Sequence, residues 1–285
     1  MIIIKLSGGL GNQMFQYAFG KSLSIQNRVE LLLDINNFGE NRAETPRKYE
    51  LSIYNINEKF ATKKQINKVK ALSIIKLIHR KISPSNSSHI LEKNYHLNNS
   101  NIIIRDIYLD GYWQDEKYFE KYKKVILNKF TINIKPHISI HKWINKIKNC
   151  NSVSIHIRRG DYITDKKVQK ILKALSINYY IKAIRKIEHM KIEPVFFIFS
   201  DDIKWAREEF TRRQNIYFVE HGGEDYENLR IMSLCQHNII ANSSFSWWGA
   251  WLNKNPHKIV IGPKEWFCDK KRIKLSIMPK KWLKL

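Results

Sequence analysis

Short apolar runs alternate with amphipathic stretches through the second half of the chain, and this alternation predicts its fold class. Five runs rich in β-branched or aromatic residues are predicted as strands: Ser152–Ile157, Val195–Phe199, Ile216–Val219, Asn238–Ala241 and Lys258–Ile261. Stretches with helical spacing are expected over residues 177–190, 202–213, 225–237 and 245–254. Strands that alternate with helices are typical of βαβ units, so we expect an α/β fold with a parallel sheet.

The first half begins in the same way, with a strand, a glycine-rich turn and a helix. Its expected elements are a strand over residues 2–6, a turn over 7–11, a helix from Asn12, a strand over 29–33, a basic helix over 59–81, a loop over 83–88, a strand over 102–109, and helices over 115–124 and 136–148. We expect an N-terminal domain over residues 1–150 and a C-terminal domain over residues 151–285.

Composition and charge narrow the classes of function. The chain has 285 residues, 43% of them hydrophobic, and no apolar run long enough to predict a membrane-spanning helix. Its three cysteines include no CxxC pair, which argues against a disulfide framework and a structural zinc site and suits a cytoplasmic protein. The net charge of +24 favours an anionic partner, namely nucleic acid, a phosphorylated small molecule or an anionic lipid surface. Because the lysines are scattered, a compositional bias explains the charge equally well.

Polar and charged residues follow the strands of the second half, at the edge where open parallel sheets bind ligands. They come after four strands: His156, Arg158, Arg159 and Asp161 at the first, Asp201 and Asp202 at the second, residues 221–225 at the third, and residues 242–249 at the fourth. Random placement would scatter such residues over both edges, so this edge is the candidate site.

Arg158 and Arg159 are the candidates for binding a phosphate, because guanidinium groups present paired donors in a fixed geometry. Asp161 is placed to orient one of them, and His156 points to the same side of an extended strand as Arg158. A diphosphate leaving group gains negative charge as a glycosidic bond breaks, so an arginine there stabilises the transition state more than the ground state. The structural alternative is an Arg–Asp pair on a surface loop.

Two other segments precede helices in the manner of anion sites. The turn Gly8–Gly11 fits neither GxGxxG nor GxxxxGK[ST], so a tight turn and an anion site are equally supported, although Asn12 favours contact with a polar ligand. The segment Ser243–Ser246 is either a phosphate cradle or an N-cap.

Adjacent carboxylates and a tryptophan cluster complete the candidate chemistry. Asp201 and Asp202 either contact a ribose hydroxyl or guanine edge or cap the next helix. They do not form the DxD pattern that holds a diphosphate through a metal, and no other residues gather as ligands for zinc or magnesium. Trp247, Trp248 and Trp251 are expected in the core.

Four ordered segments together resemble the bacterial α-1,2-fucosyltransferases, glycosyltransferase family eleven. Residues 156–162, with the sequence HIRRGDY, are similar to the HxRRxDY signature of that family. Residues 8–18, 199–205 and 242–248 are similar to its other segments. The matches extend from residue 8 to residue 252, so the resemblance covers nearly the whole chain.

The resemblance implies a GT-B architecture, in which two Rossmann-like domains face each other across a cleft. It implies an inverting transfer of fucose from GDP-β-L-fucose to O2 of a terminal β-galactoside, with no metal or other cofactor required. Catalytic roles fall to Arg158, Arg159 and Asp161, with Arg158 on the β-phosphate. The implied donor-binding residues are Gly11, Asn12, His156, Asp201, Asp202, Ser243, Ser244, Phe245 and Ser246.

Inversion by a single displacement usually employs a general base, and no carboxylate identifies itself as that base. The candidates are Asp161, Asp165, Glu224 and Asp225. Departure of the nucleotide can dominate the barrier, in which case a strong base is less necessary.

We therefore expect a cytoplasmic enzyme at the inner membrane surface that modifies a lipid-linked oligosaccharide such as an O-antigen unit. The N-terminal domain would hold the acceptor and the C-terminal domain the GDP moiety. The alternatives are a GT-B transferase with another nucleotide sugar, a non-catalytic sugar-binding module and a nucleic-acid-binding protein. Only the charge favours the last, because the sequence has no basic run, RNP motif, helix-turn-helix signature or zinc knuckle.

Overall fold

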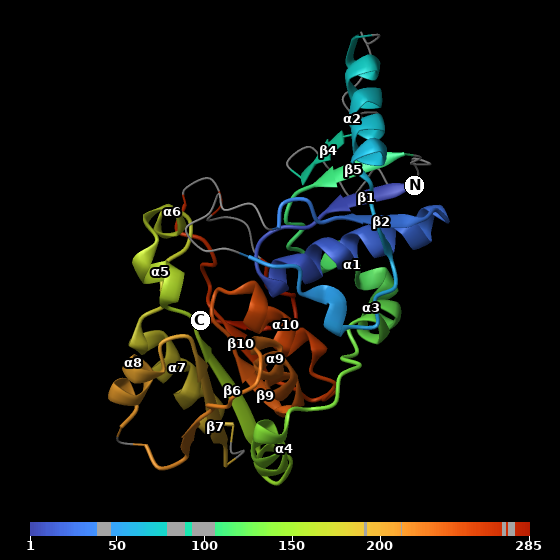
Figure 1. Cartoon of the computed structure of the whole chain (residues 1–285). Helices are drawn as coiled ribbons and strands as arrows, with labels where there is room; N and C mark the ends of the chain where they lie inside the picture. The colour runs from blue at the N-terminus through green and yellow to red at the C-terminus, as the bar shows by residue number, and fades with distance from the viewer. Residues whose placement is uncertain are drawn as a thin grey trace. The chain divides into compact units, whose positions relative to one another are not determined.

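A computed structural model of the chain describes residues 1–38, 47–78, 89–92, 106–190, 193–211, 213–269, 272 and 277–285. The chain divides into two compact units, Met1–Asn133 and Ile134–Leu285. Each unit contains a parallel sheet with helices packed against it (Figure 1). The predicted α/β class is therefore confirmed.

The first unit is organised around the short central strand β1. Its helices and strands are β1 Ile2–Lys5, α1 Leu10–Asn27, β2 Leu31–Asp34, β3 Lys59–Phe60, α2 Lys63–Ile78, β4 His89–Leu91, β5 Ile107–Asp110 and α3 Lys123–Lys129. The strands lie in the order β3-β2-β1-β5-β4, and every described pairing is parallel. The strand that follows β1 in the chain therefore lies on one side of it, and β5 lies on the other.

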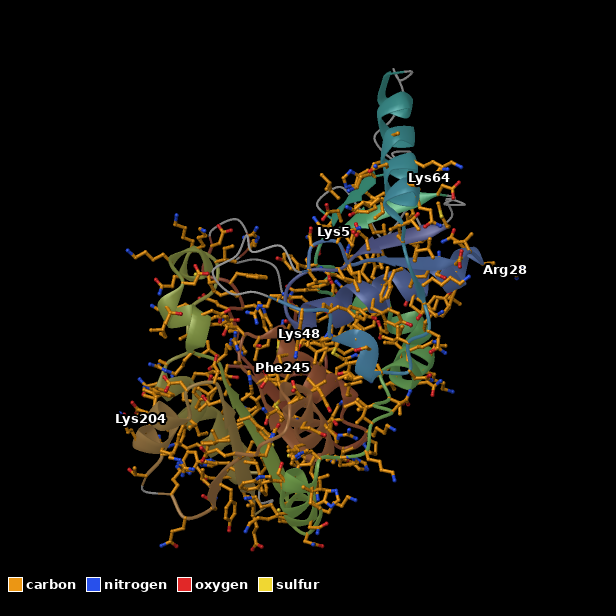
Figure 2. The ribbon with its side chains drawn as sticks, viewed as in Figure 1. Lys5, Arg28, Lys48, Lys64, Lys204 and Phe245 are labelled. Carbon is orange, nitrogen blue, oxygen red and sulfur yellow. The ribbon has the colours of Figure 1, made fainter. Side chains whose placement is uncertain are left out.

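Alternate side chains of β1 face different helices, because successive residues of a strand point to opposite faces. Ile3 packs with Ile66 and Val69 of α2. On the other face, a Cβ atom added to Gly20 of α1 would lie 3.1 Å from the Cβ of Ile4, so the missing side chain lets α1 approach the sheet closely. The opposite side of α2, marked by Lys64 in Figure 2, is exposed.

The second unit has the same plan with one more strand. Its helices and strands are α4 His141–Lys148, β6 Ser152–Ile157, α5 Gly160–Thr164, α6 Lys166–Gln169, α7 Ile177–Glu188, β7 Val195–Ser200, α8 Ile203–Glu209, β8 Ile216–Phe218, α9 Asp225–Leu234, β9 His237–Ile239, α10 Ser244–Leu252, β10 Val260–Gly262 and β11 Leu283–Lys284. The strands lie in the order β11-β10-β9-β6-β7-β8, again with parallel pairings.

The central strand β6 has one apolar and one polar face. Val153 and Ile155 belong to the core that α7 and α8 cover. On the other face, the hydroxyl of Ser154 accepts a hydrogen bond of 2.7 Å from the side-chain amide of Asn238. His156 therefore projects from this second face, where α9 and α10 lie.

Each sheet reverses its strand order once, beside its central strand. In the second unit β6, β7 and β8 follow one another to one side, and the chain then returns to place β9 on the other side of β6. In the first unit the reversal lies between β1 and β5. Open α/β sheets bind ligands at the carboxyl ends of the strands at this position, the topological switch point.

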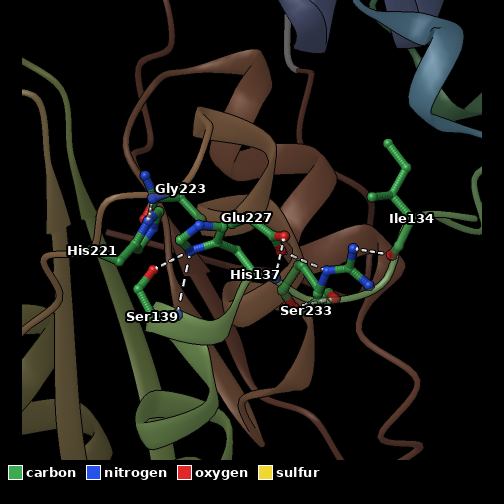
Figure 3. A network of polar contacts seen from close by, with 9 residues as sticks. Ile134, His137, Ser139, His221, Gly223, Glu227 and Ser233 are labelled. Atoms are coloured by element: carbon green, nitrogen blue, oxygen red, sulfur yellow. Dashed lines mark hydrogen bonds and ion pairs between the residues drawn. The ribbon is translucent and has the colours of Figure 1, made fainter.

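The two compact units divide after Asn133, earlier than the boundary at residue 150 expected from the sequence. Polar contacts tie the segment 134–148 to α9 of the second unit (Figure 3). The backbone N–H of His137 donates to the buried carboxylate of Glu227 at 3.1 Å, and Arg230 donates to the other oxygen at 2.7 Å. Arg230 also donates to the carbonyl of residue 134 at 2.7 Å. No periodic signal in the sequence indicates this network.

Most predicted elements are present with shifted ends. Residues 115–124 differ, because they form two 3-10 turns, Glu116–Tyr118 and Glu120–Tyr122, before α3 begins. The edge strands β3, β4 and β11 were not predicted, since runs of two or three residues have no readable period. The expected loop over residues 83–88 and the start of the strand expected over residues 102–109 lie outside the described residues. Within the described part of the chain, no helix combines the length and hydropathy needed to cross a bilayer.

Candidate functional site

The carboxyl end of β6 holds Arg158 between two carboxylates. Its Nε and one Nη donate to Oδ1 of Asp161 at 3.0 and 2.8 Å, and its other Nη lies 3.0 Å from Oδ2 of Asp201. Asp161 lies in the first turn of α5, and Asp201 follows β7, the strand beside β6. A guanidinium carries five N–H donors, so at least two remain for an anion. Arg158 is therefore oriented before a ligand binds, which lowers the entropy lost on binding.

Arg159 is fixed by three contacts of different kinds. Its Nε donates to Oδ2 of Asp202 at 2.9 Å, and its backbone N–H donates to Oδ1 of Asp201 at 2.8 Å. Its guanidinium lies over the ring of Trp205, 4.1 Å from the ring centroid, at a distance typical of cation–π contact. Arg159 and Trp205 also line a cavity of about 430 Å³ in the second unit, together with Tyr162.

Contacts within this cluster favour the charged forms of Arg158 and Asp202. Burial opposes the charge on Arg158, but Asp201 and Asp161 outweigh it and raise the pKa of the guanidinium. The hydrogen bond from Arg159 lowers the pKa of Asp202. Two guanidinium groups against three carboxylates leave a formal charge of −1, so the net charge of the cluster does not attract an anion. Attraction must come from the remaining N–H donors and from neighbouring backbone dipoles.

Gly160 is required by the close approach of Asp201. A Cβ atom added at this position would lie 2.6 Å from Oδ2 of Asp201, the oxygen that contacts Arg158. No real Cβ contact is so short, so any other residue must displace the carboxylate. The glycine between Arg159 and Asp161 is therefore part of the geometry of the arginine pair, a role that its place inside the motif did not reveal.

His156 lies beneath this cluster as a neutral, buried side chain. It is 7% exposed, and its ring centroid lies 5.7 Å from that of Phe245 at the start of α10. Burial lowers the pKa of His156 to about 4, with Asp201 opposing and Arg158 adding to the shift. Its Nδ1 has no hydrogen-bond partner among the described residues. A buried ring nitrogen in this state is suited to a hydrogen bond with a ligand.

The first turn of α10 presents backbone N–H groups beside β9, on the other side of the switch point from Arg158. Ser243 occupies the N-cap position, but its side chain makes no capping hydrogen bond, and Ser244 begins the helix. The hydroxyl of Ser246 lies within hydrogen-bond distance of the carbonyls of Ala241 and Ser243, at 3.3 and 3.2 Å, and is buried. Phe245, labelled in Figure 2, brings its ring towards His156. The helix N-terminus is suited to an anion, whereas Ser246 is used inside the protein.

Four of the carboxylates expected to contact the nucleotide or the acceptor, Asp161, Asp165, Asp201 and Asp202, already have partners within the second unit. Asp201 and Asp202 hold the two arginines, and Asp202 also caps α8 by accepting from the backbone N–H of Trp205. Asp165 caps α6, accepting from residues 167 and 168. Glu224 and Asp225 lie at the N-terminus of α9. The geometry brings Asp161 and Asp201 together with the arginines and singles out none of these carboxylates as a base.

The switch point of the first unit combines side-chain amides with charged groups. Lys5 and Asp110, which end β1 and β5, form an ion pair of 3.2 Å, and a Cβ atom added at Gly9 would lie 3.6 Å from a guanidinium nitrogen of Arg47. After β1, Gly8 adopts a positive φ of 74°, and a Cβ atom there would lie 2.7 Å from the amide nitrogen of Asn12. Gln114, which follows β5, donates its side-chain amide to Oδ1 of Asn12 at 2.8 Å. Gly11 is buried in the first turn of α1. Gln114 therefore contacts Asn12 across the reversal, and no pattern in the sequence indicated this contact.

Two buried glutamines of α1 hold the loops around this switch point. Gln13 donates to the carbonyls of Gly8 and Lys48 at 2.9 and 2.8 Å and accepts from the backbone of Glu50. Gln16 donates to the hydroxyl of Ser7 at 3.0 Å and to the carbonyl of Gly111 at 3.1 Å. Their role is structural, so Asn12 is the amide of this helix turn that is left near the surface.

Within the described residues, no three histidine, cysteine, aspartate or glutamate side chains gather in a way that could hold a metal ion. The three cysteines are free thiols. Trp247, Trp248 and Trp251 are buried in α10, as expected from the sequence.

Sequence comparisons place this chain among glycosyltransferases. The profile of glycosyl transferase family 11 matches residues 1–285. The chain is 38% identical to the O-antigen biosynthesis glycosyltransferase WbnK of Escherichia coli over 296 aligned positions, covering 95% of this chain and 97% of that protein. It is 34% identical to an alpha-1,2-colitosyltransferase of the same species, covering 100% of this chain and 99% of that protein.

A solved structure shows the fold. NodZ, a fucosyltransferase from Bradyrhizobium solved as an α-1,6-fucosyltransferase soaked with GDP-fucose, superposes with a TM-score of 0.55 and 12% identity, covering 88% of this chain and 91% of that chain. The expected GT-B type of fold is thereby confirmed.

Proposed function

Because this chain belongs to glycosyl transferase family 11, we propose that it is an inverting α-1,2-fucosyltransferase that moves fucose from GDP-β-L-fucose to O2 of a terminal β-galactose. Its assignment as a glycosyltransferase rests on the family, and the donor, acceptor and linkage are our proposal. The observation that carries it is Arg158, held by two carboxylates with donors to spare at the switch point of the second unit.

The diphosphate of the donor would bind between Arg158 and the N-terminus of α10. These groups lie on the two strands that flank the switch point, β6 and β9, where the fold exposes backbone and side-chain N–H donors. Arg159, fixed by Asp202 and Trp205, supports the second side of the anion. The neutral ring of His156 donates or accepts a hydrogen bond at the nucleotide without adding charge.

In the proposed reaction, O2 of galactose attacks C1 of fucose while the bond from C1 to the β-phosphate oxygen breaks. The electron pair of that bond stays on the diphosphate, and the hydroxyl proton leaves to solvent. Arg158 stabilises the growing charge on the phosphate, and Asp161 keeps the guanidinium in position. The protein supplies this stabilisation through fixed N–H donors, so the proposal requires no metal or other cofactor.

We further propose that the acceptor is held by the first unit and is a lipid-linked oligosaccharide such as an O-antigen unit, at the cytoplasmic face of the membrane. The relative WbnK is named for O-antigen biosynthesis, which supports this choice of pathway. The amides of Asn12 and Gln114 support the assignment of the first unit, because neutral amides both donate to and accept from sugar hydroxyls.

The direct test is to incubate the protein with GDP-fucose and a panel of β-galactosides and to determine the linkage of the product. A fucosyl-α-1,2-galactoside is expected, and donor turnover should fall when another nucleotide replaces GDP. Transfer to a different hydroxyl, or no turnover of GDP-fucose with any galactoside, would refute the proposed activity.

A second candidate donor is GDP-colitose, because a relative named as a colitosyltransferase is 34% identical over the full length of this chain. Colitose is fucose without the hydroxyl at C3. A site that hydrogen-bonds this hydroxyl rejects the deoxy sugar by a factor of about 10⁴–10⁵, whereas an apolar site discriminates weakly. The ratio of kcat/KM for the two donors therefore decides between them.

A further inference from the structure

We propose that the exposed face of α2, defined by Lys63, Lys64 and Lys68 and called here the α2 lysine face, docks on an anionic phospholipid surface. The proposal deepens the proposed function, and rests on it, in that a lipid-linked acceptor would lie at such a surface. It names the part of the chain that makes the contact.

The α2 helix has two faces with separate roles. Ile66 and Val69 are buried and pack against the sheet of the first unit. Lys63, Lys64 and Lys68 are exposed, and the spacing of four residues places Lys64 and Lys68 one above the other on the helix. The apolar face thus fixes the helix, and the lysines are left pointing away from the sheet.

These lysines destabilise the helix itself, because of where they lie in it. Thr62 and Gln65 form a capping box at its start, with the Gln65 backbone N–H donating to the Thr62 hydroxyl at 3.2 Å and the Thr62 N–H donating to Gln65 Oε1 at 2.8 Å. The first turn then carries Lys63 and Lys64 and no acidic residue, although the helix dipole disfavours cations at this end. Lys64 and Lys68 also repel each other at a spacing of four residues. A local rule broken without a structural gain indicates a function.

The helix α7 shows the opposite arrangement and provides an internal comparison. Its exposed cations Arg185 and Lys186 lie in the last turn, where the helix dipole favours positive charge. Lys182 lies one turn earlier and is also exposed. The basic residues of α7 therefore have a structural explanation that those of α2 do not have.

Among the described residues, no carboxylate forms an ion pair with Lys63, Lys64 or Lys68. The sequence shows the same imbalance on a larger scale, because residues 61–91 contain six lysines and one arginine but no aspartate or glutamate. The positive potential of this segment is therefore not cancelled by its neighbours in sequence.

A lipid surface suits α2 better than a nucleic acid does. The helix has no aromatic side chain for stacking on bases and no arginine for bidentate contact with a base or phosphate. Lysines near an anionic leaflet each strengthen binding by a factor of about five, so a few of them together are sufficient for reversible attachment.

The test compares two triple variants of the full chain in sedimentation with vesicles. The α2 variant is Lys63→Gln, Lys64→Gln and Lys68→Gln, and the matched control in α7 is Lys182→Gln, Arg185→Gln and Lys186→Gln. Vesicles of phosphatidylcholine with phosphatidylglycerol should bind the parent protein, and vesicles of phosphatidylcholine alone should not. The α2 variant should lose about 100-fold in partitioning, and the α7 control less than about five-fold.

Equal losses of vesicle binding in both variants would show that the net charge of the protein alone causes the binding, and would overturn the proposal. Unchanged vesicle binding in the α2 variant, or binding lost only towards a duplex oligonucleotide, would also overturn it. Circular dichroism and transfer to a soluble galactoside, both expected to be unchanged in the α2 variant, show that the protein remains folded. A parent protein that binds vesicles but transfers no fucose would refute the proposed function while leaving the lipid contact intact.

Discussion

The two units share one strand plan, with the order reversing beside the central strand, yet they carry different side chains at that point. In the second unit, two arginines and three carboxylates surround the end of β6. In the first, Asn12 and Gln114 meet as neutral amides beside Gly8. The fold thus provides two equivalent positions for a ligand, and in our proposal the arginine pair receives the phosphate charge and the two amides receive sugar hydroxyls. This difference is what assigns donor and acceptor to separate units in our proposal.

The largest effect is expected from removing Arg158, which lies at the switch point of the second unit. Arg158→Ala should lower kcat for transfer by about 10²–10³-fold, because it removes donors aimed at charge that develops in the transition state. Steady-state kinetics with GDP-fucose and lactose, together with calorimetry of GDP binding, measure it. Arg158→Lys should recover little, since one ammonium cannot reach Asp161, Asp201 and the phosphate together. Full activity in Arg158→Ala would remove the basis of the donor site.

Gly160→Ala tests the same switch point of the second unit, because it displaces the carboxylate of Asp201 without removing a charge. The new Cβ atom must displace Oδ2 of Asp201 and with it the support of Arg158, so kcat should fall by about 10- to 100-fold. Gly222→Ala is the matched control, because no atom lies within 4 Å of a Cβ added there. If the two variants have equal kcat, the close contact with Asp201 does not matter for the reaction.

His156 should make the stability of the second unit sensitive to acid. Its folded pKa of about 4 lies below the unfolded value of about 6.5, so between these values the unfolded state binds more protons and stability falls as pH falls. Lowering the pH from about 7 to about 5 should cost about 2 kcal/mol from this group alone. Urea unfolding followed by tryptophan fluorescence, at both pH values, measures it. His156→Gln should flatten this dependence, and an unchanged slope would contradict a buried neutral imidazole.

The smallest effect is expected at the switch point of the first unit. Gln114→Ala removes one partly buried hydrogen bond of 2.8 Å to Asn12, which is worth about 0.5–1.5 kcal/mol. We expect the KM for the acceptor to rise by about two- to ten-fold while GDP affinity is unchanged. Gln114→Glu should retain more function, because the amide of Asn12 can turn to donate to the carboxylate. A change in GDP affinity instead would place the donor, and not the acceptor, against the first unit.

The sequence predicted the second unit better than the first, for a physical reason. Strand β7 is a continuous apolar run up to its last residue, and β6 alternates polar and apolar residues with a period of two, so both patterns are readable. In the first unit, β3 has two exposed residues and β4 has three half-buried ones, which leave no pattern. The division after Asn133 was not predicted either, since it depends on contacts of Glu227 and Arg230 with residues distant in sequence.

Residue types predicted which side chains cluster at the site, but not how they pair. Placing Asp201 and Asp202 after β7 follows from the alternation of strands and helices. Their use as partners of Arg158 and Arg159 depends on the register of β6 with β7, in which Ile157 lies opposite Ser200. Register is set by packing across the sheet, which no local signal in the sequence reports. The contact of Gln114 with Asn12 was hidden for the same reason, because it joins residues 102 positions apart.

The central position of β6 has a consequence for how the protein is made. Its polar pairing partner Asn238 is 84 residues further along, and the hydroxyl of Tyr162 bonds to a carbonyl 80 residues away. At a synthesis rate of about 5–20 residues per second, a ribosome needs roughly 4–16 s to deliver the missing strand. The phenylalanine-rich β7 is completed about halfway through that interval, and until β9 is made β6 keeps an open edge, which invites association between nascent chains. Slower growth at low temperature, with chaperones present, should therefore raise the soluble yield more than any change at the surface.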